Sequence, residues 1–279
     1  MRFTKYHGAG NDFIIIDARA LERPWSELSQ SMCIRHFGVG ADGIILVAAG
    51  ERRLKMRMFN PDGSEAEACG NGLRCFVKYV LDEGIVHDDE FTVDTVGGPR
   101  RVLAFRGADG TVSEVELCMG TPRLAPEEIP AVAPGRTAPV LDLPLEVGGQ
   151  LLALTLVSMG NPHAVAFTGE DPARFPLTTI GPLVEQHEMF PARTNFEVVR
   201  MQQTGDADAR VWERGVGETL ACGSGACAIA VAARLHGYCG NELRVHLPGG
   251  TLTISWSGDK EEVRLRGPVK RVFAGDWPD

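Results

Sequence analysis

The chain has 279 residues, of which 44 % are hydrophobic and 23 % are charged, and its formal net charge is −9 with a sequence pI of about 5.3. This composition is typical of a globular protein with a sizeable core and argues against a disordered chain. An acidic surface repels phosphate backbones, no apolar run reaches the about 18 residues of a membrane span, and the N-terminus lacks a signal-peptide core. We therefore expect a cytoplasmic protein with no nucleic-acid or membrane partner.

Strand patterns dominate the first part of the chain, and they are interrupted by two helix patterns. The strands are expected at 13–17, 43–47, 54–59, 91–96, 100–105 and 112–117. The helices are expected at 26–37 and 70–83. The stretch 121–150 is rich in proline and predicts a connecting or edge segment.

The second part of the chain repeats this alternation. The strands are expected at 151–157, 163–167, 196–202, 209–213, 243–247, 251–256 and 261–267, and the helices at about 178–187 and at 224–236. The helix at 224–236 is apolar nearly all round, so it must be wrapped by other structure. A last strand pattern lies within 268–279 and can pair with either half.

Two stretches of the chain have similar sequences. MFNPDGSEAEACGNG at 58–72 aligns with VWERGVGETLACGSG at 211–225, so that Cys69 matches Cys222. Upstream, the Gly-Asn pair that ends at Asn11 resembles the pair that ends at Asn161. An internal repeat on this scale indicates two copies of one structural plan.

The repeat predicts an α+β fold with two pseudo-symmetric halves, each a mostly antiparallel sheet wrapped around a central helix. We expect an N-terminal half at 1–118, joined by the strand in 268–279, and a C-terminal half at 119–267. The active site is expected in the cleft between the halves.

Cys69 and Cys222 each stand before a Gly-x-Gly that opens a helix. Unpaired N–H groups and the positive dipole end at a helix start stabilise a thiolate, so the cysteine pKa is expected to fall from about 8.5 towards neutrality. The same N–H groups form a nest for a carboxylate. If the halves face each other, one thiolate removes the α-hydrogen of an amino acid and one thiol delivers a hydrogen to the opposite face.

The other five of the seven cysteines are expected to be structural thiols, because the chain has no CxxC pair and no export signal. The polar residues that accompany the two key cysteines are Asn11, Asn60, Asn71, Asn161, His163, Asn195, Glu213, Arg214, Glu218 and Ser224. Arg214 suits a second carboxylate through bidentate hydrogen bonds, and Glu213 suits an ammonium or a neighbouring side chain. His163 is either a site group or a turn residue.

Five motifs in order resemble the diaminopimelate epimerase family. They are HGAGNDFIIID (7–17), FNPDGSEAEACGNGLRC (59–75), SMGNPHAV (158–165), WERGVGETLACGSGACA (212–228) and LPGGTL (247–252). The resemblance implies an isomerase, independent of pyridoxal phosphate and of any other cofactor, that interconverts LL- and meso-diaminopimelate in lysine and peptidoglycan precursor biosynthesis. It also implies a homodimer, a small-molecule substrate and no metal.

The family roles carry over motif by motif. The resemblance implies that Cys69 and Cys222 are the acid/base pair. It implies that Gly70, Asn71, Gly223 and Ser224 hold the reacting carboxylate, and that His163 and Glu213 tune the site. The rest of the substrate would be held by Asn11, Asn60, Asn161, Asn195, Glu213 and Arg214. One departure is Gly43, where some family members carry an amide that helps to bind substrate.

Other functions stay open on the residues alone. A proline or hydroxyproline racemase uses two cysteines similarly, but its substrate has no second amino-acid head for Glu213 and Arg214. An isomerase of this fold without the cysteine pair is disfavoured by Cys69 and Cys222. A thiol hydrolase would use Cys222 with His163 and would tolerate the loss of Cys69. A metal or redox module is disfavoured by the absent CxxC spacing.

Overall fold

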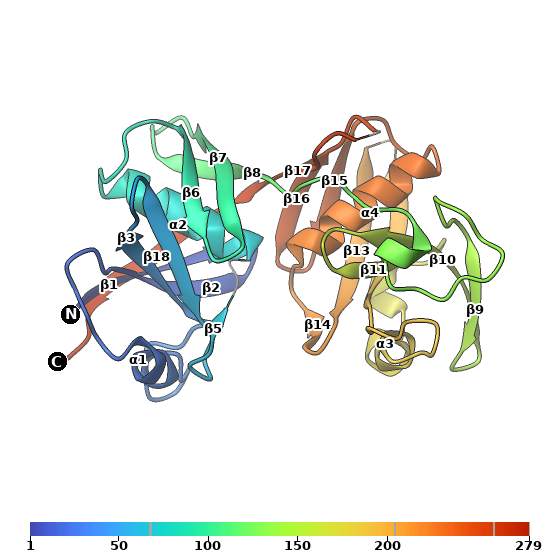
Figure 1. Ribbon diagram of the computed structural model, residues 1–279, viewed down its shortest axis with the longest axis horizontal. Coiled ribbons are helices and arrows are strands. Elements are labelled where there is room, and N and C mark those ends of the chain that lie inside the picture. Colours follow the sequence, from blue (N-terminus) through green and yellow to red (C-terminus); the bar gives the residue numbers. More distant parts are fainter. Residues whose placement is uncertain (67–68, 204, 259, 279) are drawn as a thin grey trace. The chain divides into compact units, whose positions relative to one another are not determined.

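The computed structural model describes residues 1–66, 69–203, 205–258 and 260–278. The chain divides into two compact units (Figure 1). Unit 1 comprises Met1–Cys118 together with Arg266–Asp279, and unit 2 comprises Met119–Leu265. Each unit is described by itself below.

Unit 1 is a sheet that encloses one helix. Its elements are β1 (Arg2–Gly8), β2 (Asn11–Asp17), α1 (Trp25–Met32), β3 (Ile44–Ala49), β4 (Leu54–Phe59), β5 (Glu65–Ala66), α2 (Gly70–Asp82), β6 (Glu90–Thr95), β7 (Gly98–Arg106), β8 (Val112–Cys118) and β18 (Lys270–Asp276). Helix α2 contacts β1, β2, β3, β7 and β8, and its residues from Asn71 to Leu81 are buried. The enclosure extends to two charged residues of the helix, Arg74 and Lys78, which are buried as well.

Unit 2 is built in the same way around α4. Its elements are η1 (Pro126–Glu128), β9 (Leu143–Val147), β10 (Gln150–Ser158), β11 (Pro162–Phe167), η2 (Pro172–Arg174), α3 (Leu177–Glu185), β12 (Asn195–Gln203), β13 (Asp206–Glu213), β14 (Gly217–Thr219), α4 (Gly223–Leu235), β15 (Glu242–Leu247) and β16 (Gly250–Ser255). β17 (Arg264–Pro268) spans the point where the chain passes from unit 2 to unit 1. Helix α4 contacts β10, β11, β12, β15 and β16.

The strand pairings are the same in both units. In unit 1, β1 pairs antiparallel with β2, β2 parallel with β3, β3 antiparallel with β4, β4 parallel with β6, and β6 antiparallel with β7. In unit 2 the same sequence of pairings joins β10, β11, β12, β13, β15 and β16. The predicted fold class is confirmed: each unit is a mostly antiparallel sheet around a central helix.

The two central helices begin and end alike. Each begins at a cysteine N-cap, Cys69 or Cys222, and each is followed two residues after its last residue by a glycine with positive φ, Gly84 (+65°) or Gly237 (+73°). Glycine adopts this left-handed conformation without the steric penalty of a Cβ atom, which ends the helix. The repeat seen in the sequence is therefore a repeat of helix signals as well as of residues.

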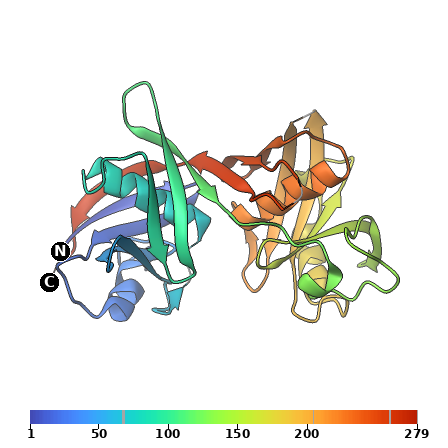
Figure 2. The same ribbon diagram turned by 45° about the horizontal axis from the view of Figure 1, so that its top comes forward.

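The chain termini lie together in unit 1. β18 pairs antiparallel with β1, and the amino group of Met1 donates a hydrogen bond of 2.6 Å to the carbonyl of Trp277. The N–H of Trp277 in turn donates to the carbonyl of Met1 at 2.7 Å. Both views of the ribbon show the two ends side by side (Figures 1 and 2).

Some predicted elements differ from the structure. The helix expected at 26–37 is observed as Trp25–Met32, because the N–H groups of Val39 and Gly40 fold back onto the carbonyl of Met32. The strand expected at 261–267 is observed at Arg264–Pro268. Four strands were not predicted, namely β1, β5, β9 and β14. Of these, β9 pairs with β10 and lies within the stretch 121–150, where an edge segment was expected.

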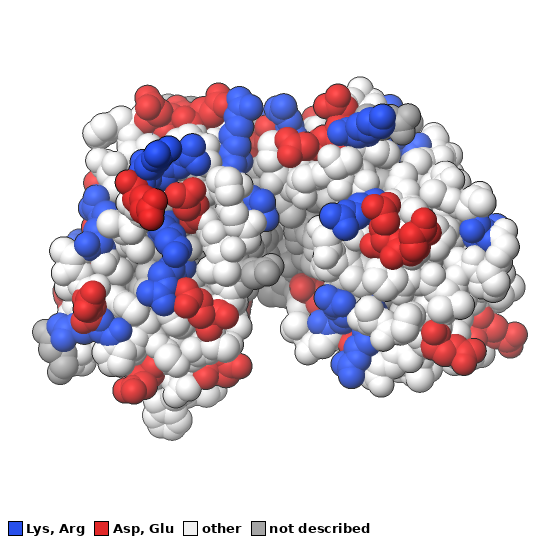
Figure 3. Space-filling view, viewed as in Figure 1, with Lys and Arg blue, Asp and Glu red and all other residues white. Residues whose placement is uncertain are grey.

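No helix in the described part of the chain is long and apolar enough to cross a membrane. On the described part of the face in Figure 3, lysine and arginine are interspersed with aspartate and glutamate. That face therefore presents mixed charge rather than one basic patch.

Candidate active site

Cys69 sits at the start of α2, where its side chain acts as the helix cap. Its φ and ψ of −88° and 153° are extended, and its sulfur accepts a hydrogen bond of 3.2 Å from the N–H of Gly72. A Cβ on Gly72 would lie 3.2 Å from the same sulfur and 3.0 Å from Ile45, so the absence of a side chain lets the first turn pack closely there. The backbone of the first turn thus closes around the thiol.

Asn11, from the start of β2, joins the cysteine to the helix tip. Its Oδ1 lies 4.0 Å from the thiol of Cys69 and accepts a hydrogen bond of 3.3 Å from the amide of Asn71. Asn71 in turn accepts a bond of 2.8 Å from the buried guanidinium of Arg74. Unit 1 therefore gathers three predicted site residues, Asn11, Cys69 and Asn71, around one helix start.

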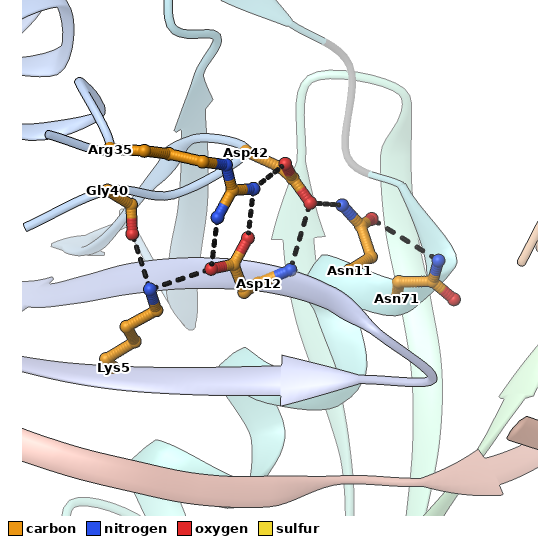
Figure 4. A network of polar contacts seen from close by, with 7 residues as sticks. All are labelled: Lys5, Asn11, Asp12, Arg35, Gly40, Asp42 and Asn71. Atoms are coloured by element: carbon orange, nitrogen blue, oxygen red, sulfur yellow. Dashed lines mark hydrogen bonds and ion pairs between the residues drawn. The ribbon is translucent and has the colours of Figure 1, made fainter. Parts of the chain in front are cut away.

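A charged network behind Asn11 fixes the direction of its amide (Figure 4). The NH2 group of Asn11 donates to Asp42 at 2.6 Å, so its oxygen faces Cys69 and Asn71. Arg35 bonds both Asp42 and Asp12, and Lys5 reaches Asp12 at 2.7 Å. Burial opposes the charge of Asp12, but the hydrogen bonds from Arg35 and Lys5 outweigh it and lower the pKa of its carboxyl.

Cys222 caps α4 in the same manner. Its φ and ψ are −113° and 118°, and its sulfur accepts a hydrogen bond of 3.4 Å from the N–H of Gly225. A second contact of 3.5 Å joins the sulfur to the hydroxyl of Ser224. The two cysteines therefore occupy equivalent caps in the two units.

A chain of polar contacts runs from Cys222 into the core of unit 2. Asn161, just before β11, donates to the Ser224 hydroxyl at 3.3 Å, and its Oδ1 lies 3.1 Å from Nε2 of His163. Nδ1 of His163 lies 2.7 Å from Oε1 of Glu197 on β12. His163 and Glu197 are both 0 % exposed. The imidazole is therefore held from both sides.

The electrostatics at Cys222 differ from the sequence prediction. A pKa lowered by the helix start was expected, but the pKa of Cys222 is raised well above its usual value. Burial is the main cause, and the charges of Glu213 and Glu197 add to it. The hydrogen bonds from Ser224 and Gly225 oppose the rise without cancelling it. Burial and the two carboxylates therefore favour the thiol form of Cys222.

A second group of predicted residues lies at the end of β13. Asn195 donates to the carbonyl of Pro162 at 2.7 Å and accepts a bond of 2.9 Å from the N–H of Arg214. The Arg214 guanidinium is exposed and donates to the carbonyl of Ala192 at 3.0 Å. Glu213 accepts a short hydrogen bond from Thr219. Asn195 therefore orients the turn that carries Arg214.

The remaining predicted residues are less connected. The side chain of Asn60 donates to Ser64 at 3.0 Å, and Glu218 pairs with Arg210 at 2.7 Å on the surface of unit 2. A Cβ on Gly43 would lie 2.7 Å from the carbonyl of Phe59, so this backbone leaves no room there for a side chain.

Sequence reasoning missed Asp42 and Glu197. The only signal for Glu197 was a carboxylate inside the apolar strand pattern FEVVRMQ. No group of three or more His, Cys, Asp or Glu side chains is placed to hold a metal ion within the described ranges.

The sequence is similar to one family along most of its length. The family model described as diaminopimelate epimerase matches residues 3–124 and 155–272. A diaminopimelate epimerase of Moorella thermoacetica is 48 % identical over 284 residues, which is 100 % of this chain and 99 % of the relative. One of Methanococcus maripaludis is 44 % identical over 279 residues, which is 99 % of each.

The fold is similar to that of solved racemases. A hydroxyproline epimerase of Agrobacterium vitis, bound to trans-4-hydroxy-L-proline, superposes with a TM-score of 0.68 at 15 % identity. The match covers 99 % of this chain and 91 % of the other. At this identity the likeness is one of fold alone.

Proposed function

We propose, from the premise that this chain belongs to the diaminopimelate epimerase family, that it interconverts LL- and meso-diaminopimelate without a cofactor. The observation that carries the proposal is the pair of matched caps, in which Cys69 and Cys222 each receive an N–H hydrogen bond from a Gly-x-Gly helix start. Two equivalent thiols suit a reaction that removes a hydrogen from one face of a carbon and replaces it on the other.

The chemistry requires both thiols at one α-carbon. We place the substrate between the units, with its reacting carboxylate on the N–H groups of Gly70, Asn71, Gly223 and Ser224. N–H groups at two helix starts stabilise the extra negative charge that develops on this carboxylate as the α-hydrogen leaves. One cysteine takes the proton as thiolate, and the other supplies one as thiol, which inverts the configuration.

In one direction of the reaction Cys69 acts as the base and Cys222 supplies a proton from its thiol, the form that burial favours. The reverse reaction exchanges these roles. His163 and Glu213 act on the charge state of the pair, and Glu213 does so at Cys222 through its own charge.

The other end of diaminopimelate is a second amino-acid head. Arg214, held by Asn195 and Ala192, offers an exposed guanidinium for its carboxylate. Asn11, Asn60 and Asn161 supply further polar contacts. We also propose that the enzyme is cytoplasmic and that it is a homodimer. Light scattering on the purified chain would test the dimer.

The decisive experiment is deuterium exchange at the α-carbon of diaminopimelate with reductant and no added cofactor. Wild type should exchange and epimerise, and Cys69→Ala and Cys222→Ala should each abolish epimerisation. Cys239→Ala is the matched control, because this partly exposed thiol lies outside both caps. Near-normal turnover in either cap variant would refute the two-base mechanism.

A substrate panel separates the alternatives. Proline and hydroxyproline present no second head to Arg214, so we expect no turnover of either. A Cys222–His163 hydrolase is disfavoured by geometry, because both ring nitrogens of His163 are taken by Asn161 and Glu197. Turnover of an acyl substrate by Cys69→Ala would favour the hydrolase instead.

A further inference from the structure

Glu197 is a buried carboxylate that the proposed reaction does not use. It is 0 % exposed, its Oε1 contacts His163, and its Oε2 has no hydrogen-bond partner within the described ranges. Burying such a group is costly unless its environment compensates fully. Burial accordingly raises the pKa of Glu197, an effect that His163 opposes.

The duplicated fold supplies an internal reference for this pair. A Cβ built on Gly225 meets Oε1 of Glu197 at 2.9 Å, and a Cβ built on the equivalent Gly72 meets Cδ1 of Ile45 at 3.0 Å. Ile45 therefore stands in unit 1 where Glu197 stands in unit 2.

His163 has an apolar counterpart as well. It follows Asn161 by two residues, as Phe13 follows Asn11. Phe13 and Ile45 are both 0 % exposed, so the same fold is filled by apolar side chains in unit 1. The fold does not need a buried acid and imidazole, and it carries them only in the half that contains Cys222.

His163 is held through both of its ring nitrogens. Its Nε2 lies 3.1 Å from Oδ1 of Asn161, and its Nδ1 lies 2.7 Å from Oε1 of Glu197. The carboxylate of Glu197 therefore fixes the ring that faces the Asn161 amide.

This arrangement turns the Asn161 amide toward the cysteine. With its oxygen on His163, its NH2 group donates to Ser224, which leaves the serine hydroxyl hydrogen free to donate to the sulfur of Cys222. In unit 1 the amide faces the other way, because Asp42 takes the NH2 group of Asn11. The two caps therefore receive opposite ends of an asparagine amide.

We propose that Glu197 is a positioning residue for Cys222: it holds the His163 ring in place, and the ring sets the direction of the Asn161 amide. Through Ser224, the direction of that amide decides whether the Cys222 sulfur receives a hydrogen bond. The charge of Glu197 acts in addition, because it favours the thiol form of Cys222.

The groups that face Glu197 in unit 2 are few. They are His163 from β11, Glu213 from β13 and Cys222 at the start of α4. Glu213 carries the same charge as Glu197, so replacing Glu197 does not remove the whole negative field at Cys222. The inference rests on the proposed function only in taking Cys222 as a proton carrier.

The test measures Cys222 without substrate. Full-length wild type and Glu197→Gln are treated with iodoacetamide from pH 6 to 10, and alkylation is quantified by peptide mass spectrometry. Gln retains a hydrogen bond to His163 but removes the charge, so the ionisation of Cys222 should move to lower pH. One pKa unit corresponds to roughly tenfold faster alkylation below the pKa. Cys69 in the same samples is the control and should be unchanged.

A second variant separates positioning from packing. Glu197→Ile with His163→Phe carries the residues of unit 1 at both positions, so it should fold and should also move the Cys222 profile to lower pH. An unchanged Cys222 profile in a folded variant would overturn the proposal. Failure of both variants to fold would overturn it too, since the pair would then be structural. Because no substrate is used, either result is independent of whether diaminopimelate is turned over.

Discussion

Gly225, in the first turn of α4, offers a quantitative test of how tightly the Cys222 cap is built. A Cβ there would lie 2.9 Å from Oε1 of Glu197 and 3.4 Å from the cysteine sulfur. Helix propensity favours alanine by about 1 kcal/mol, but overpacking costs about 1–3 kcal/mol. Displacing the Glu197–His163 hydrogen bond adds about 1.5–3 kcal/mol. Gly225→Ala should therefore lower the free energy of unfolding by roughly 1.5–5 kcal/mol.

The assay is urea unfolding followed by circular dichroism. Gly72→Ala is the matched control in unit 1, where the nearest atom is the methyl end of Ile45 at 3.0 Å, which can shift more cheaply than a tethered carboxylate. Gly72→Ala should therefore lower the free energy of unfolding clearly less than Gly225→Ala does. In a Glu197→Ala background the effect of Gly225→Ala should fall below about 1 kcal/mol, because the two sites are coupled. An equal loss with and without Glu197 would refute the reasoning.

Two further predictions concern stability. Gly181→Ala on α3 places a Cβ 2.6 Å from the Trp212 ring, so it should lower the free energy of unfolding by about 1–3 kcal/mol and alter the tryptophan fluorescence. Gly169→Ala is the control and should be nearly neutral, because a Cβ there meets no atom within 4 Å. Equal losses of stability in the two variants would contradict this prediction. Asp12 has a lowered pKa in the fold, so its stabilisation is present above its unfolded pKa of about 3.9 and is lost as the pH falls through the folded pKa. The stability difference between wild type and Asp12→Asn should thus be full at pH 6 and shrink below about pH 4, and a difference independent of pH would count against the network.

The sequence predicted the repeat because its signals are local. The Cys-Gly-x-Gly caps at Cys69 and Cys222 and the glycines that end both helices are readable without coordinates. The family prediction from five motifs is confirmed by relatives that are 48 % and 44 % identical over nearly the full chain. The fold class followed from the same repeat and is also confirmed.

Features that depend on tertiary contacts could not be predicted from the sequence. β1 was missed because RFTKYHG mixes charged and apolar residues, and only the structure pairs Lys5 with Asp12 on the neighbouring strand. The pKa of Cys222 was predicted in the wrong direction because the helix start is local, whereas burial and Glu197 come from other elements. The assignment of substrate contacts to Asn60 and Arg214 stays a prediction.

The pairing of β18 with β1 determines which of the two units can be completed first during synthesis. Unit 2 is continuous, so all of its residues have left the ribosome once Leu265 is exposed. Unit 1 is begun first, but its sheet is complete only once β18, which follows unit 2 in the chain, can pair with β1. The unit that is begun first is therefore completed after the other, and until β18 is made Phe3 lacks its aromatic neighbour Phe273.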